Sequence, residues 1–160
     1  MINVTLIYVG KLKEKYLRDG CDEYIKRIGA FCSLNMVEIN EEKISDNPSP
    51  AQIETVIQKE GERILAKIPS GAYVVPMCIE GKQLSSEELS QMIEKNSVQG
   101  TSRFVFIIGG SYGLSDEVKK RASFKLSMSK MTFPHQLARM MLLEQLYRAF
   151  SISNNGKYHK

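Results

Sequence analysis

Hydrophobic and polar positions follow two alternating patterns along the chain. Short β-branched and aromatic runs, typical of buried strands, take turns with stretches in which apolar residues recur every three to four positions, as in amphipathic helices. Strands are expected at residues 2–9, 34–39, 72–79, 103–108 and 123–129. Helices are expected at about 12–31, 51–67, 85–96, just after 115, and 135–153. Alternation of this kind predicts an α/β fold with a mostly parallel sheet of about five strands and helices on both faces.

Capping residues and prolines mark several of these boundaries. Ser85 and Glu88 match a capping box, and Ser115 precedes two acidic residues suited to the first turn of a short helix. Pro134 is expected to be the first residue of the last helix. Pro76 lies inside the third strand, where it implies an edge position, a bulge or an early end. No repeat or linker divides residues 1–160, so we expect one domain with a short tail at 154–160.

Composition narrows the class of protein without defining a function. Three dispersed cysteines and two histidines argue against a disulfide framework and a metal site, so no metal is expected. No segment approaches the roughly 20 apolar residues of a membrane span, and the first residues lack signal-peptide features. We therefore expect a cytoplasmic protein with no membrane association. The net charge of +4 suits a polyanionic partner such as nucleic acid but does not require one.

A glycine-rich bend, Gly109, Gly110 and Gly113, follows the expected strand 103–108. The dinucleotide fingerprint would need glycine where Ile108 stands, and no Walker-type motif is present, so phosphate cradling is poorly supported. A tight strand-to-helix turn and a close ligand approach both remain open for the glycines. The loop 128–135 is rich in small hydroxyl and apolar side chains and could enclose an adenine-like or thioether ligand, or simply connect strand to helix. Together with the segment after the third strand, the two loops form a more specific constellation at one sheet edge.

The order and spacing of several longer motifs resemble one known family over nearly the whole chain. The motifs are FVFIIGGSYGLS, LSMSKMTFPHQLARMMLLEQLYRAFSI and the terminal YHK, supported by VGKLKEKY, KEGERILAKI and IEGKQLSSEEL. They are similar to those of the bacterial RlmH family of SPOUT-class methyltransferases. The members of that family methylate N3 of a pseudouridine in helix 69 of 23S ribosomal RNA.

The resemblance implies an architecture and a cofactor that residue patterns alone would not indicate. It implies a trefoil knot over about 103–153, a homodimer, and S-adenosylmethionine bound in the knot. It also implies action on ribosomal RNA within the assembled ribosome. The donor would be held by residues of three loops. Those residues are Met77, Gly109, Met128, Ser129, Lys130, Met131, Thr132 and Phe133.

Four residues are candidates for catalysis. His135 precedes the last helix beside the donor loop and can serve as a base, although a capping or surface histidine is the alternative. Arg139 lies one helical turn further on, where it could steer a phosphate or stabilise an imide anion. The resemblance implies that Tyr158 and His159 of the tail belong to the RNA-facing site and could be supplied across the dimer.

Other charged residues and other functions stay open. Glu144 and Arg148 match a helix salt bridge, and the basic run at 11–18 is either a phosphate contact or a solvated helix face. A SPOUT methyltransferase with another RNA target, such as transfer RNA, is one alternative function. A non-enzymatic factor of the same fold that binds or assembles ribosomes is the other.

Overall fold

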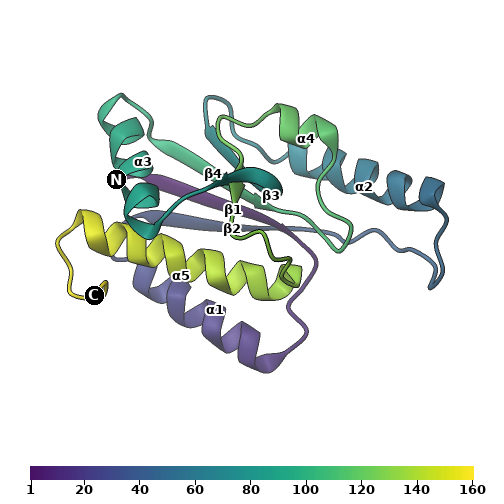
Figure 1. Ribbon diagram of the computed structural model, residues 1–160, viewed down its shortest axis with the longest axis horizontal. Helices are drawn as coiled ribbons and strands as arrows, with labels where there is room; N and C mark the ends of the chain where they lie inside the picture. The colour runs from purple at the N-terminus through teal and green to yellow at the C-terminus, as the bar shows by residue number, and fades with distance from the viewer.

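A five-stranded parallel sheet forms the centre of the computed structural model, which describes residues 1–160 (Figure 1). The strand order is β2-β1-β4-β3-β5, and every pairing within it is parallel. The strands are β1 (Asn3–Val9), β2 (Ser33–Ile39), β3 (Tyr73–Gln83), β4 (Arg103–Ile108) and β5 (Leu126–Ser127). The α/β prediction is therefore confirmed.

Helices cover both faces of the sheet, as expected. Figure 1 shows α1 and α5 lying together on one side, with α2 and α4 on the other. The helices are α1 (Lys15–Ile28), α2 (Pro50–Leu65), α3 (Ser86–Val98), α4 (Asp116–Lys120) and α5 (His135–Ser153). Side chains of β4 alternate between two cores: Phe104 and Phe106 pack with α1, α3 and α5, whereas Val105 and Ile107 face α2 and α4. A central strand buried on both faces explains why 103–108 is so hydrophobic.

The caps expected at α3 and α4 are present. Ser85 accepts from the Glu88 amide at 3.1 Å while Glu88 accepts from the Ser85 amide at 2.8 Å, which completes the capping box. Ser115 accepts from the amide of Val118 at 3.3 Å. Ser49 and Gln52 form a second capping box at the start of α2, which the sequence analysis did not identify.

Three expected boundaries were wrong. β3, expected to end at residue 79, continues to Gln83, where it pairs with β5. The strand predicted at 123–129 contains only Leu126 and Ser127, because the amides of Ser123 and Phe124 both donate to the carbonyl of Val74 instead of forming a ladder. Pro134 is not the first residue of α5 but precedes it, with an extended ψ of 138°, and the helix begins at His135.

Pro76 and Gly81 shape the path of β3. Pro76 ends the pairing of β3 with β4, opposite Ile107, and the pairing with β5 changes register between Met77 and Lys82. The sequence left an edge position, a bulge or an early end open for Pro76. The irregular pairing beside it matches a bulge. A Cβ on Gly81 would lie 2.7 Å from the carbonyl carbon of Leu126, so glycine is required where β5 passes β3. The trefoil knot stays a prediction.

Replacing Gly61 with alanine tests the packing of α2 on α4. Alanine in place of a mid-helix glycine usually stabilises by about 1 kcal/mol. Here the added Cβ would lie 2.9 Å from Cβ of the buried Ser115, the cap of α4. We expect Gly61→Ala to lower the free energy of unfolding by about 1–3 kcal/mol in denaturant titrations.

The matched control for Gly61→Ala removes the opposing side chain. Glycine at an N-cap costs only a few tenths of a kcal/mol relative to serine. The double variant Gly61→Ala/Ser115→Gly should therefore regain most of the free energy of unfolding that Gly61→Ala loses. A Gly61→Ala variant more stable than the parent chain would contradict the tight α2–α4 contact.

Candidate functional site

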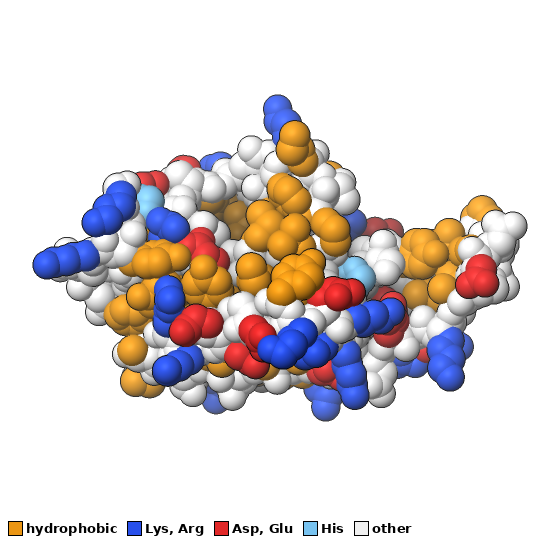
Figure 2. Space-filling model, turned by 90° about the horizontal axis from the view of Figure 1, so that it is seen from below, with side chains coloured by type: hydrophobic (Ala, Val, Ile, Leu, Met, Phe, Trp, Pro, Cys, Tyr) orange, Lys and Arg blue, Asp and Glu red, His pale blue; other side chains and the backbone are white.

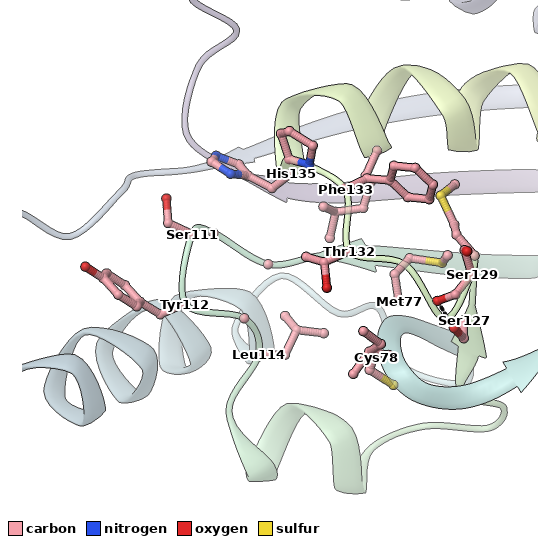
Figure 3. A pocket seen from close by; sticks show the side chains of 18 of the residues that line it. Met77, Cys78, Ser111, Tyr112, Leu114, Ser127, Ser129, Thr132, Phe133 and His135 are labelled. Atoms are coloured by element: carbon pink, nitrogen blue, oxygen red, sulfur yellow. Dashed lines mark hydrogen bonds between the residues drawn. The ribbon is translucent and has the colours of Figure 1, made fainter. Parts of the chain in front are cut away.

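One cleft of about 780 Å³ lies where β3, β4 and β5 and their following loops converge. Three segments supply most of its wall: 77–80 from β3, 108–114 after β4, and 127–135 around the loop before α5. Figure 3 shows Met77, Leu114 and Thr132, one from each segment, around the same space. The volume falls within the roughly 300–1,000 Å³ of small-molecule sites, and about half of the lining residues are apolar.

The glycine bend has a tight backbone geometry of its own. Gly110 and Gly113 form an antiparallel bridge, in which the Gly113 amide donates to the Gly110 carbonyl at 3.1 Å. Gly113 has φ of +88°, and a Cβ on Gly109 would lie 2.8 Å from the Gly113 carbonyl carbon. The turn interpretation therefore explains these glycines, and the same bend forms one wall of the cleft.

The loop before α5 leaves most of its backbone donors available. Ser127 Oγ donates to the Ser129 carbonyl at 3.0 Å, and Ser129 Oγ accepts from the Met131 amide at 3.0 Å. Among residues 129–133, only the Met131 amide has a hydrogen-bond partner within the chain. Free backbone amides beside apolar side chains suit a ligand with both polar edges and apolar surface.

Most of the residues expected to hold a ligand line this cleft, and one does not. Lys130 is exposed and lies outside the lining. The residues that do line it are Met77, Gly109, Met128, Ser129, Met131, Thr132 and Phe133. Their roles in binding stay predictions. The structure adds lining residues that the sequence did not single out, namely Cys78, Ser111, Tyr112, Leu114, Lys119 and Ala138.

His135 joins the cleft from the first turn of α5 (Figure 3). Partial burial lowers the pKa of this imidazole, and the charges of Arg139 and Lys13 lower it further, while Glu41 raises it. The side chain is therefore neutral at neutral pH and has a ring nitrogen that can accept a proton.

Arg139 is buried and does not line the cleft. Its guanidinium lies 3.9 Å from the ring centroid of Tyr8, and Nη2 donates to the Gly10 carbonyl at 3.0 Å. Nε has no partner. Within one chain these contacts join α5 to the end of β1. A catalytic role for Arg139 stays a prediction.

The tail folds back along α5 and away from the cleft. The Tyr158 hydroxyl donates to Glu144 at 2.7 Å, and the ring packs edge-on against Tyr147. His159 contacts Glu87 at 2.5 Å and Arg148 at 3.1 Å. Glu144 lies about 14 Å along the helix axis from His135. A single chain therefore does not bring Tyr158 and His159 to His135. The helix salt bridge between Glu144 and Arg148 is present at 2.7 Å.

The structure contains neither a helix suited to cross a membrane nor a cluster of metal-binding side chains. None of the helices has the length and apolarity that a membrane crossing would require. No three His, Cys, Asp or Glu side chains are grouped so that they could hold a metal ion.

A parallel sheet with a ligand-sized cleft at its carboxyl edge is the arrangement of many α/β enzymes. The model of the family described as "Predicted SPOUT methyltransferase" matches residues 2–159. The chain therefore belongs to this family and is a methyltransferase of the SPOUT class.

Close relatives carry a more particular name. The Ribosomal RNA large subunit methyltransferase H of Clostridium acetobutylicum is 54% identical, and its counterparts in Carboxydothermus hydrogenoformans and Clostridioides difficile are each 50% identical. Each alignment covers 99% of this chain and 100% of the relative. The membership that the motifs predicted is confirmed.

A solved structure supports the fold alone. It is described as a probable methylase family protein from Haemophilus influenzae Rd KW20 and is 12% identical, with a TM-score of 0.52. The match covers 99% of this chain and 70% of that one. The likeness agrees with the layered α/β arrangement of Figure 1.

Titration of His135 tests the electrostatics of the cleft. By NMR, we expect its midpoint below the ordinary value of about 6.5, because burial disfavours the charged ring. The imidazole then has a higher pKa in the unfolded chain than in the folded chain, so the unfolded chain takes up the proton at a higher pH. His135 should therefore lower the free energy of unfolding as the pH falls below the ordinary value. Glu41→Gln should lower the midpoint further, because Glu41 favours the charged form.

Signal assignment for this titration is simple because the chain has only two histidines. The His135→Gln variant retains only the signal of His159 and serves as the control. A His135 midpoint above the ordinary value, or one that rises in Glu41→Gln, would contradict the described environment.

Proposed function

We propose that the chain is an S-adenosylmethionine-dependent methyltransferase that methylates N3 of a pseudouridine in helix 69 of 23S ribosomal RNA, on the assembled ribosome. The observation that carries the proposal is the identity of 50–54% to relatives named Ribosomal RNA large subunit methyltransferase H, over 99% of this chain. The cleft at the carboxyl edge of the sheet gives the proposed chemistry a location.

The residues of the cleft fit S-adenosylmethionine. Unpartnered backbone amides of the lining residues 129, 132 and 133 match the hydrogen-bonding edges of an adenine and an amino-acid group. Met77, Met128 and Phe133 offer apolar surface for the adenine ring and the carbon chain. When bound, this cofactor would supply an already activated methyl group, so the protein's main task is to position the acceptor.

His135 is the best placed group to take the acceptor's proton. An imide nitrogen must lose its proton before or during methylation, and a neutral imidazole can accept it. His135 is partly buried, lines the cleft, and has its pKa lowered mainly by burial. A base held neutral at the working pH is ready to act without first losing a proton.

Three exposed apolar side chains surround the cleft and offer surface to a nucleobase. Ile79 is 58% exposed, Tyr112 is 40% exposed and Met131 is 73% exposed, and each comes from a different cleft segment. RNA bases removed from their stack are commonly held against aromatic and apolar groups. The acceptor base would therefore enter between these segments.

A second apolar surface supports assembly as a homodimer. A groove of about 340 Å³ beside the main cleft is lined mostly by apolar residues, among them Tyr24, Leu84, Met140 and Met141. Figure 2 shows hydrophobic side chains gathered across the face that contains α1 and α5. Covering this surface with a second copy would remove apolar area from water. It would also allow Tyr158 and His159 of one chain to approach the cleft of its partner.

Methylation of ribosomes tests the proposal directly. Ribosomes from a strain that lacks the gene should accept methyl groups at the helix 69 pseudouridine. His135→Ala should slow transfer by about 10²–10⁴-fold, as expected for loss of a general base. Calorimetry should show that this variant still binds S-adenosylmethionine. Transfer RNA and free 23S RNA serve as comparison substrates. Methyl groups found on transfer RNA, or an undiminished rate in His135→Ala, would count against the proposal.

Mixing two inactive variants tests whether the tail acts across a dimer. Neither His135→Ala nor a chain shortened before Lys157 should methylate ribosomes by itself. After unfolding and refolding together in equal amounts, half of the dimers should be mixed and hold one intact site each. About a quarter of the parent activity should therefore return. If the mixture stays inactive while native mass spectrometry shows mixed dimers, the tail does not serve the partner's cleft.

A further inference from the structure

The loop between β1 and α1 carries two basic side chains without acidic partners. Lys11 and Lys13 are exposed, and neither takes part in a salt bridge. Lys15, by contrast, contacts Asp19 at 2.7 Å, so its charge is largely compensated. The loop follows the carboxyl end of β1 and therefore lies at the same edge of the sheet as the cleft.

Hydrogen bonds on both sides hold this loop in place. Arg18 Nη1 donates to the carbonyl of Leu12 at 3.2 Å and to that of Lys13 at 2.8 Å. The Lys13 amide donates to Gln136 Oε1 at 3.1 Å. At the other end, Gly10 donates to the Ile39 carbonyl at 2.9 Å. A loop fixed in this way presents its lysines at little cost in conformational entropy on binding.

The start of α5 adds a second source of positive potential beside the loop. Gln136, which anchors Lys13, is the neighbour of the cleft residue His135. Helices α2, α3 and α4 begin with a serine cap, whereas α5 has neither a side-chain cap nor an acidic residue in its first turn. No side chain in the first turn of this 19-residue helix therefore neutralises the partial positive charge at its N-terminus.

We infer that Lys11 and Lys13, together with the start of α5, bind backbone phosphates of the RNA next to the nucleotide that enters the cleft. The inference rests on the proposed function for the identity of the polyanion. Glu41 lies beside Gly10, so the positive area is narrow and suits one or two phosphates rather than a long duplex. The loop would thereby set the register of the RNA relative to His135.

Salt-dependent binding of a fluorescent RNA stem–loop tests the phosphate site. We expect Lys11→Ala/Lys13→Ala to weaken binding at least several-fold. The slope of log affinity against log salt concentration should become shallower by about one to two, because roughly one counterion is released per phosphate contact. Gln136→Ala keeps both charges but frees the loop, so it should weaken binding without changing the slope.

The matched control is Lys67→Ala/Lys95→Ala, which removes two exposed, unpaired lysines near the ends of α2 and α3. It should leave affinity and slope unchanged, and calorimetry should show unchanged S-adenosylmethionine binding in Lys11→Ala/Lys13→Ala. Equal losses in the two double variants, no loss in either, or a parallel loss of S-adenosylmethionine binding would overturn the inference.

The outcomes also separate this inference from the proposed function. If the parent chain methylates no ribosomal RNA but Lys11→Ala/Lys13→Ala still loses affinity and slope, the proposed function fails and the phosphate site stands. If the parent chain methylates ribosomes while the double variant binds RNA as the parent does, only the phosphate site fails.

Discussion

Close approach of backbone to backbone at the carboxyl edge of the sheet is the constraint on which the cleft depends. Gly109 lies so near Gly113 that a side chain would collide with the turn, and Gly81 lies equally near the backbone at Leu126. These contacts bring the bend after β4 and the chain around β5 against β3, so that three loops share one space. The cleft wall therefore combines closely packed backbone with side chains of which about half are apolar, which fits the methyl donor proposed above.

Periodicity predicted the parts of the fold in which local pattern and tertiary packing agree. The strand at 103–108 is buried on both faces and was predicted to the residue, whereas 123–129 alternates like a strand but is diverted when Ser123 and Phe124 bond to Val74. Sheet geometry alone placed the loop 128–135 at the same edge as the glycine bend, because parallel strands end at one edge. The individual residues expected to hold a methyl donor came from the family resemblance. Cys78 and Ala138 gave no local signal. Burial of Arg139 under Tyr8 and the return of the tail onto Glu144 depend on contacts between distant residues, which no single-sequence pattern reports.

Charge is distributed unevenly around this edge. His135, held neutral, and the ion pair of Glu80 and Lys119 line the cleft, while Lys11 and Lys13 lie outside it on a loop held by Arg18 and Gln136. The charges that line the cleft thus largely balance, whereas the loop beside it offers the uncompensated positive charge that we infer binds an RNA backbone.

Hydrogen–deuterium exchange with and without S-adenosylmethionine gives the most direct test that the three loops hold the methyl donor. The amides of the lining residues 129, 132 and 133 have no partner within the chain, so they should exchange rapidly alone and become protected when the cofactor binds. Protection should also appear at 108–114 and spare α2. Protection confined to other parts of the chain, or none at saturating cofactor, would contradict the assignment of this cleft as the methyl-donor site.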